Sequence, residues 1–318
     1  MKVVIAGGTG QVGTVLARAM HADGHDVVVF SRRPVEALWR VVLWDAKWIG
    51  GWSCELDGAD VVVNLAGRNV NCRYNALNRR EIIASRIDST RAIADSIASC
   101  ARPPRVWLQA STATIYAHRF DAANDEATGL IGGAERNAPD TWRFSIDVAK
   151  AWEQTANDAI LPRTRLVLMR SAMTMSPDRG GIFDTLLGLV RRGLGGTSGD
   201  GRQFVSWIHE CDFVRTVYWL IEHNEFTGPV NLASPRPLPN AEFMRTLRAK
   251  WRTRIGLPAA QWMLEVGAVV LRTETELILK SRRVVPRRLV DAGFAFEFPA
   301  WPEAAEDLCR RWRALRQG

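Results

Sequence analysis

Two short apolar runs and one amphipathic stretch make up the first thirty residues. Residues 3–6 (VVIA) and 27–30 (VVVF) are unbroken apolar runs, typical of strands buried on both faces of a parallel sheet. Between them, apolar residues recur at helical spacing from Val12, and Gly24 is suited to end that helix. The pattern predicts a strand, a helix and a second strand in succession.

Strand and helix patterns keep alternating beyond this unit. Apolar runs over 58–67 and 106–117 predict two more buried strands, and residues 84–97 between them have the pattern of a long helix. An amphipathic helix is expected at 182–191. Such alternation is typical of an α/β fold with a doubly wound parallel sheet and helices on both faces.

The pattern becomes mainly helical towards the end of the chain. Asn240 is suited to cap a helix, and residues 261–281 predict a further helical stretch. Alternating aromatic residues at 293–299 (GFAFEFP) predict an edge strand. No repeat or low-complexity linker precedes these elements, so we expect them to pack on the main domain.

Three glycines follow the first apolar run at the spacing GxxGxxG. They lie between a predicted strand and a predicted helix. Glycine in such a turn permits the tight bend, the close approach of a pyrophosphate and the close packing of helix on strand, and the helix N–H groups attract phosphate. In this context the spacing predicts a dinucleotide site formed by Gly7, Gly8, Thr9, Gly10, Gln11, Val12 and Gly13.

The end of the second strand bears on which dinucleotide is bound. An NAD site usually places an acidic residue there to accept the ribose hydroxyls. Here Ser31, Arg32 and Arg33 follow the strand, and no acid occurs before Glu36. A hydroxyl and two guanidinium groups suit a 2′-phosphate, which favours NADP(H) over NAD(H). Surface decoration in an arginine-rich chain is the alternative.

The motif and the change of pattern together predict the domain organisation. We expect residues 1–235 to form an NADP-binding domain of the Rossmann type, including a substrate loop at about 171–210. Residues 236–318 are expected to form a smaller, mainly helical domain that packs on it and completes a substrate lobe. The glycine-rich loop between Gly193 and Gly201 would permit close approach and movement there.

Composition narrows the classes of function without adding a site. The chain has 318 residues, and its content of 47% hydrophobic and 24% charged residues is that of an ordinary globular protein. Its formal net charge is +8. Of the 42 basic residues, five are lysines. We interpret this charge as an arginine-rich solvated surface, and we expect no nucleic-acid partner.

Targeting signals and metal-binding patterns are also missing from the sequence. No apolar run approaches the roughly 18 residues of a membrane span, and we find no signal peptide before Val3. A cytoplasmic protein with no membrane partner is therefore expected. The five cysteines are scattered without CxxC spacing, so we interpret them as packing residues and predict neither disulfides nor a metal site.

With these motifs in place, the chain resembles the extended and atypical short-chain dehydrogenases/reductases, the group that includes nucleotide-sugar epimerases. More narrowly, it resembles the epimerase-family branch with a small C-terminal domain of unknown function (DUF1731-like). The similarity spans residue 2 to about residue 305. The segments that carry it are NLAG, SRIDST, GLGGTSGDGRQFVSWIHECDF, NLASPRPLPNAEF and SRRVVPRRLVDAGFAFEFP.

The resemblance implies further site residues. Leu65, Ala66 and Gly67 would line the adenosine-ribose side of the cofactor, and Arg86 would lie on the cofactor side too. Thr112 would stand where the family places an active-site serine or threonine; a strand-end hydroxyl that caps the backbone is the alternative. In the substrate lobe, Gln203 and Trp207 could bind a polar or ring-shaped substrate, although Trp207 is equally suited to a core.

The family's catalytic Tyr-x-x-x-Lys pair is missing. Its lysine lowers the tyrosine pKa and holds the nicotinamide ribose, and four-residue spacing puts both on one helical face. Alignment on Trp152 and Glu153 places Ser145 at the tyrosine position and Ala149 at the lysine position. Lys150 would be rotated by about 140° from the required face, so we expect it on the surface.

Other groups could move a proton in place of that pair. Besides Thr112 and Ser145, we consider Glu126, since the acidic pair Asp125–Glu126 falls where relatives place acids beside the substrate cleft; a surface acidic pair is the alternative. His209 lies in the characteristic SWIH segment. Its alternative role is structural, with a hydrogen bond to Asp212.

Two functions remain open at this point. The first is an NADP(H)-dependent oxidoreductase or epimerase-like enzyme that acts on an unknown small polar substrate without the usual Tyr-x-x-x-Lys pair. The second is a non-catalytic NADP(H)-binding sensor or regulatory protein. Either would be a monomer or a homodimer.

Overall fold

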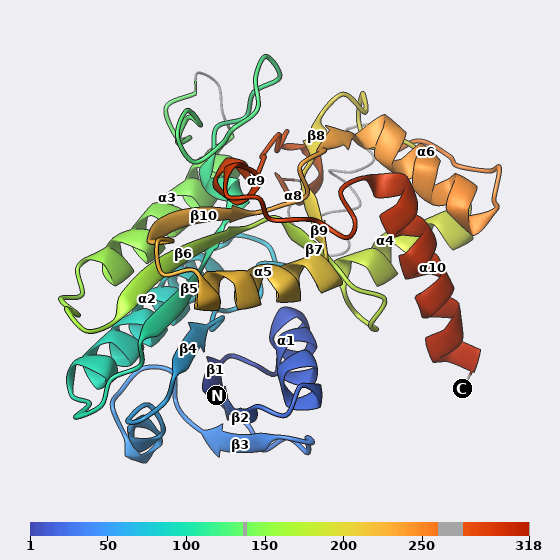
Figure 1. The fold of residues 1–318 in the computed structure, drawn as a ribbon. Coiled ribbons are helices and arrows are strands. Elements are labelled where there is room, and N and C mark those ends of the chain that lie inside the picture. The colour runs from blue at the N-terminus through green and yellow to red at the C-terminus, as the bar shows by residue number, and fades with distance from the viewer. Residues whose placement is uncertain (136–138, 260–275, 318) are drawn as a thin grey trace.

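The structure, a computed structural model, describes residues 1–135, 139–259 and 276–317. Its centre is a parallel sheet with strand order β10-β6-β5-β4-β1-β2-β3 (Figure 1). The strands are β1 (Lys2–Ala6), β2 (Asp26–Ser31), β3 (Arg40–Leu43), β4 (Val61–Asn64), β5 (Val106–Thr112), β6 (Arg165–Ser171) and β10 (Gly228–Leu232). This confirms the expected Rossmann-type sheet, whose order reverses between β1 and β4.

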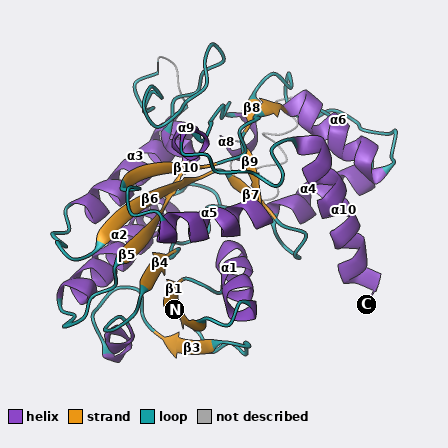
Figure 2. Ribbon diagram, viewed as in Figure 1, coloured by secondary structure: helices purple, strands orange, loops and turns teal. Residues whose placement is uncertain are grey.

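Helices cover both faces of the sheet (Figure 2). One face carries α1 (Gln11–Ala22) and α5 (Glu210–Glu222), and the other carries α2 (Ala76–Ala98) and α3 (Asp140–Asn157). Alternate strand residues face opposite layers: Val3 joins the core under α1 and α5, whereas Val4 joins the core under α2. Strands buried on both faces need unbroken apolar runs, which explains the sequence pattern.

A third core lies beyond the edge of the main sheet. It joins the middle of the chain, including Phe183 of α4 (Ile182–Arg191) and Trp207 of β9 (Trp207–His209), to the C-terminal helices α6 (Asn240–Trp251) and α10 (Trp301–Gln317). Figure 1 shows α4, α6 and α10 gathered on one side of the molecule. The expected substrate loop and the C-terminal part therefore share one hydrophobic core.

Shorter elements complete the described chain. β7 (Met173–Met175) pairs with β9, and β8 (Phe204–Val205) pairs with β11 (Leu238–Pro239). The 3₁₀ turns are η1 (Gly51–Glu55) and η2 (Ala113–Ile115), and the short helices are α8 (Glu276–Leu279) and α9 (Arg287–Asp291). The helix predicted at 261–281 falls mostly outside the described residues.

Three local predictions are wrong. Pro239 is the N-cap of α6, and the Asn240 side chain instead accepts a hydrogen bond from the Ser198 backbone N–H at 2.9 Å. Residues 293–299 form no strand, because the N–H groups of Glu297 and Phe298 donate to Asp212 rather than to a neighbouring strand. Among the free cysteines, Cys54 is exposed rather than packed.

Candidate functional site

The glycine turn joins β1 to α1 and packs on the end of β4. Gly7 has φ +75°, and a Cβ there would lie 2.8 Å from the backbone of Ala66. A Cβ at Gly13 would lie 2.5 Å from the Cα of Gly8. At Gly10 the nearest atom would be 3.6 Å away. Gly7 and Gly13 are therefore required for packing, whereas the backbone at Gly10 is open to an approaching group.

A cavity of about 370 Å³ lies beside this turn at the carboxyl ends of the strands. Its lining includes Gln11, Val12, Leu65, Ser111 and Thr174. Within the described residues, Gln11 Nε2 and Thr174 Oγ1 are buried without a hydrogen-bond partner. Because buried polar groups are normally paired, these two atoms fit a site completed by a polar ligand such as a dinucleotide.

The predicted 2′-phosphate residues follow β2. Ser31 is buried, and its Oγ accepts from the Arg33 N–H at 3.2 Å. The side chains of Arg32 and Arg33 are exposed, and the described part of the chain offers neither of them a carboxylate partner. Arg32 also borders a depression of about 430 Å³ with Asp45 and Trp48. Two cations are thus available at the end of β2.

The loop after β4, which packs on the glycine turn, contacts helix α2. The Ala66 N–H donates to Asn64 Oδ1 at 3.0 Å, and Gly67 lies against the Arg86 guanidinium. Arg86 Nη1 donates to two backbone carbonyls at 3.1 Å, and its guanidinium lies over the ring of Trp152. Burial lowers the pKa of Arg86 to about 10, so it remains a cation at neutral pH.

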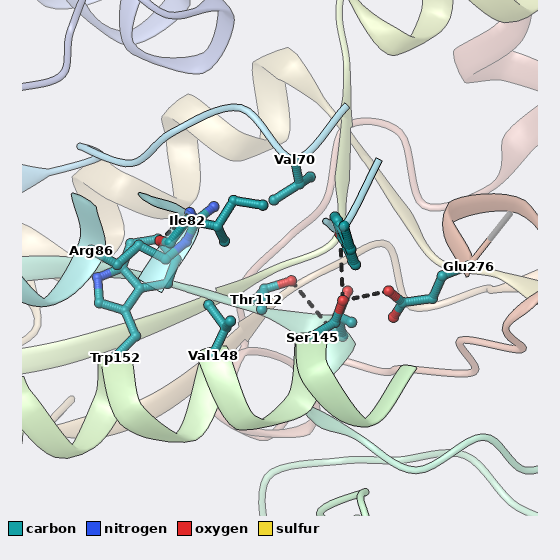
Figure 3. Close-up of a pocket in the computed structure, with 10 residues that line it drawn as sticks. Val70, Ile82, Arg86, Thr112, Ser145, Val148, Trp152 and Glu276 are labelled. Atoms are coloured by element: carbon teal, nitrogen blue, oxygen red, sulfur yellow. Dashed lines mark hydrogen bonds between the residues drawn. The ribbon is translucent and has the colours of Figure 1, made fainter. Parts of the chain in front are cut away.

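A second, smaller cavity of about 100 Å³ lies between α2, α3 and β5. Figure 3 shows Arg86 and Trp152 at one end, Ser145 and Glu276 at the other, and Thr112 between them. Thr112 Oγ1 accepts from the Thr114 N–H at 3.1 Å and caps η2. Thr112 therefore performs the backbone-capping role and also lines this pocket.

Ser145 occupies the inner face of α3. Its Oγ donates to Glu276 Oε2 and lies 3.5 Å from Tyr74 Oη. Ala149 is fully buried in a small core cluster, and Lys150 is exposed as expected. α3 thus presents a hydroxyl to the pocket at the position where the resemblance predicts a tyrosine.

Two residues of this pocket were missed by sequence reasoning. Tyr74 lies in the loop before α2, and Glu276 begins α8. Burial raises the pKa of Tyr74 above its ordinary value, although the neighbouring Ser145 hydroxyl and the charge of Arg86 lower it. Tyr74 is one of only three tyrosines in the chain, and this small number is the sequence signal that points to it. No sequence pattern around Glu276 indicates that its side chain lies in this pocket.

Two basic side chains lie near the Glu276 carboxylate. Arg282 Nη2 lies 3.6 Å from Glu276 Oε1. Lys280 is buried, its Nζ donates to the Thr114 carbonyl at 2.8 Å, and burial lowers its pKa to about 8. The pocket therefore combines hydroxyl groups, one carboxylate and nearby positive charge.

Glu126 lies apart from both cavities. Its carboxylate accepts the Asn231 N–H at 2.8 Å and the Arg288 N–H at 3.3 Å, and burial raises its pKa. Asn231 is also bonded to Tyr116, whose hydroxyl accepts from Arg170. In this arrangement Glu126 connects β10 to α9, and Tyr116 belongs to a buried hydrogen-bond network.

His209 is fully buried at the start of α5. Its Nδ1 accepts the Cys211 N–H at 3.1 Å, and its Nε2 lies 3.2 Å from Asp307 Oδ2. The partner is therefore Asp307 of α10 and not Asp212, whose carboxylate binds the backbone of 297–298. Burial lowers the pKa of His209 to about 4. His209 joins α5 to α10 as a neutral imidazole.

The two predicted substrate residues are buried as well. Gln203 Nε2 donates to the Ser198 carbonyl at 2.8 Å. Trp207 is completely buried, edge-on to Trp301 in the third core. Neither residue lines the two cavities described above.

The described residues contain neither a metal-binding cluster nor a membrane-spanning helix. None of their histidine, cysteine, aspartate and glutamate side chains gathers in a group of three or more that could hold a metal ion. None of their helices has the length and apolar character needed to cross a membrane.

Comparison with known proteins agrees with this geometry. The chain is 31% identical to the human "Epimerase family protein SDR39U1" over 97% of its length and 99% of that protein. A crystal structure of the human protein with NADPH superposes with a TM-score of 0.82 at 30% identity, covering 98% of this chain and 99% of that chain.

Other relatives are bacterial. A Staphylococcus epidermidis "Epimerase family protein" is 27% identical over 97% of this chain and 99% of its own length. The structure of a nucleoside-diphosphate sugar epimerase from Corynebacterium glutamicum has a TM-score of 0.75 at 26% identity and covers 100% of this chain and 62% of that chain. A domain of unknown function (DUF1731) matches residues 259–308. The NAD dependent epimerase/dehydratase family matches residues 3–233, and the chain belongs to that family.

Proposed function

We propose that this protein is an NADP(H)-dependent oxidoreductase or epimerase-like enzyme acting on a small polar molecule. The observation that carries the proposal is that consecutive residues at the end of β5 line the two cavities. Ser111 lines the larger cavity beside the glycine turn, and the next residue, Thr112, lines the smaller polar pocket. A cofactor in the first would bring its reactive end next to a substrate in the second.

The residues on the cofactor side fit NADP(H). The open backbone at Gly10 and the N-terminus of α1 would bind the pyrophosphate, and Arg32 and Arg33 would bind the 2′-phosphate. Gln11 and Thr174 would provide polar contacts in the larger cavity. When bound, the nicotinamide donates or accepts a hydride. The NADPH in the human relative's crystal structure supports this choice of cofactor.

A binding titration followed by a substrate screen tests the proposal. The fluorescence of the 13 tryptophans is followed as NADPH or NADH is added, and we expect NADPH to bind more tightly. The protein is then given NADPH with aldehydes, ketones and nucleotide-sugars, or NADP⁺ with alcohols, while the nicotinamide absorbance is recorded. Absence of binding by either nucleotide would contradict the proposal.

The double variant Arg32→Ala/Arg33→Ala tests the cofactor preference. Since hydrogen bonds to charged groups contribute about 1.5–3 kcal/mol, NADPH affinity should fall about 10- to 100-fold, with little change for NADH. The control is Arg91→Ala, which removes an exposed arginine from α2. An equal loss of NADPH and NADH affinity would mean that these arginines do not read the 2′-phosphate.

A non-catalytic NADP(H) sensor is the second candidate. The observation in its favour is that the Ser145 hydroxyl is already bonded to Glu276 in a pocket of about 100 Å³, on a helix without the usual pair. Tight NADPH binding together with no nicotinamide oxidation or reduction across the screen would favour this second function.

A further inference from the structure

Three segments far apart in the sequence meet at the position of the missing tyrosine. Ser145 comes from α3, Tyr74 from the loop before α2, and Glu276 from α8. We propose that these residues form a proton-transfer chain that replaces the Tyr-x-x-x-Lys pair, with the Tyr74 phenol contacting the reacting oxygen of the substrate. This inference rests on the proposed enzymatic function and assigns its proton donor and acceptor.

Tyr74 is held firmly enough to act as a catalytic residue. Its exposed fraction is 8%, and its ring packs edge-on against Phe144 of α3 with centroids 5.0 Å apart. Its carbonyl accepts from Arg79 Nε at 2.8 Å, and the next residue, Asn75, caps α2 through its side chain. The phenol is therefore fixed between two helices and borders the pocket.

Glu276 is suited to be the far end of the chain. Its exposed fraction is 1%, and its Oε2 accepts a hydrogen bond from the Ser145 hydroxyl. Arg282 lies beside Oε1 and also donates Nη1 to the Glu276 carbonyl oxygen at 3.3 Å. A buried carboxylate needs such a counter-charge to remain ionised. Glu276 can thus accept a proton that Ser145 passes on.

The charged and titratable groups that act on Tyr74 lie on α2, on α8 and in its own loop, whereas α3 contributes the Phe144 ring and the Ser145 hydroxyl. Arg86 of α2 favours the phenolate, whereas Glu276 of α8 and Cys72 of the same loop oppose it. A phenol placed between a cation and a carboxylate can accept one proton and release another without staying ionised. The 3.5 Å separation of Tyr74 Oη and Ser145 Oγ is long for a hydrogen bond, and contacts of this kind often shorten when substrate binds.

The proton path balances for the oxidation of an alcohol. The hydride leaves carbon for the oxidised nicotinamide dinucleotide. The alcohol proton moves to Tyr74 Oη, the phenol proton moves to Ser145 Oγ, and the serine proton moves to Glu276 Oε2. A C=O bond forms, both protein hydroxyls are regenerated, and Glu276 ends protonated. Reduction of a carbonyl compound is the same path reversed.

A double-mutant cycle tests the chain without any substrate. The three tyrosines are replaced by 3-fluorotyrosine, and Tyr74→Phe identifies the Tyr74 signal by fluorine NMR. The ionisation midpoint of that signal is measured in the wild type, Glu276→Gln, Ser145→Ala and the double variant. Removing the carboxylate should lower the midpoint, and the shift should fall to about half or less in the Ser145→Ala background.

Equal shifts in both backgrounds would overturn the proposal, because Glu276 would then act on Tyr74 only through space. Ser145→Thr is the matched variant that keeps a hydroxyl, and it should keep the coupling. Tyr218→Phe is the control for tyrosine replacement, because Tyr218 on α5 bonds to Asp23 at the C-terminal end of α1 and lines neither cavity. This variant should leave the Tyr74 midpoint unchanged.

Turnover gives the second readout. With any compound from the screen that the wild type converts, Tyr74→Phe should lower kcat about 100-fold or more with unchanged NADPH affinity, and Tyr218→Phe should not. Unchanged kcat in Tyr74→Phe would overturn the proton chain and leave the proposed function standing. Failure of the wild type to bind NADPH would instead reject the proposed function, whatever the NMR cycle shows.

Discussion

The glycine-turn side and the pocket side of this molecule are built in different ways. On the glycine-turn side, residues 7–13 form one turn whose backbone meets the backbone of Ala66 after β4. On the pocket side, Tyr74, Ser145 and Glu276 meet through their side chains. The first side depends on glycines that have no side chain, and the second depends on side chains that converge from separate elements.

This difference shows how the two sides can change independently. A residue with a Cβ at Gly7 or Gly13 would collide with backbone, so the turn has few alternatives. On α3, Ser145 and Ala149 stand where the family resemblance predicts tyrosine and lysine, and the helix packs on β5 and β6. The pocket can thus receive new chemistry while the turn stays the same.

The largest loss of stability is expected from breaking the buried ion pair between Arg170 and Glu153. Arg170 donates to both oxygens of Glu153 at 2.7 and 2.8 Å, and Glu153 also accepts from Ser111. Arg170→Met would leave this buried carboxylate without its counter-charge. We expect the free energy of unfolding to fall by about 3–5 kcal/mol, measured by urea denaturation with circular dichroism.

An exposed ion pair provides the control for that measurement. Arg119 pairs with Asp121 at the surface, so Arg119→Met should change stability little. Similar losses of stability in the two variants would mean that the buried Arg170–Glu153 pair stabilises the protein no more than a surface pair does. That result would contradict the view that the pocket side depends on its side-chain contacts.

The glycine turn should give a smaller change in stability with a clear effect on binding. Gly13→Ala places a methyl group 2.5 Å from Gly8 Cα, so we expect a loss of about 1–3 kcal/mol from overpacking together with loss of NADPH binding. Gly10→Ala has room for its methyl in the folded protein. It should keep the melting temperature but bind NADPH about 100-fold more weakly, since the pyrophosphate approaches there.

Thermal unfolding and NADPH titration of both variants check this prediction. Normal NADPH affinity in Gly10→Ala would show that the phosphate groups lie elsewhere. A normal melting temperature in Gly13→Ala would show that the turn can relax, and the packing argument for this side would be wrong.

The smallest effect, taken per pH unit, is a pH dependence of stability away from both cavities. The pKa of His209 is lowered to about 4 in the folded protein, against about 6.5 in an unfolded chain. Between these values the unfolded state binds more protons, so the stabilisation is complete above about pH 6.5 and is lost as the pH falls towards 4. The slope should reach at most about 1.4 kcal/mol per pH unit.

His209→Asn should flatten that slope while keeping a residue suited to cap α5. The free energy of unfolding at several pH values between neutral and acidic checks it, and NADPH affinity at neutral pH serves as the control. An unchanged slope in His209→Asn would assign the pH dependence to other groups.

The sequence by itself determined the sheet, its helices and the glycine turn. The predicted runs 3–6 and 27–30 fall within β1 and β2, and the helix predicted at 182–191 is α4. These features depend on periodicity and on residues adjacent in the chain, both of which can be read locally. Sequence reasoning also named Thr112 and Ser145, since the family resemblance assigns those positions.

Only the tertiary structure decided what surrounds those two residues. Tyr74 and Glu276 are 71 and 131 positions away from Ser145, and no local pattern records a contact between side chains at such separations. For the same reason Asp307 replaces Asp212 as the partner of His209, and Asp212 binds the backbone of residues predicted to form a strand. Backbone conformation follows from neighbours in sequence, whereas a pocket is made by side chains that the fold brings together.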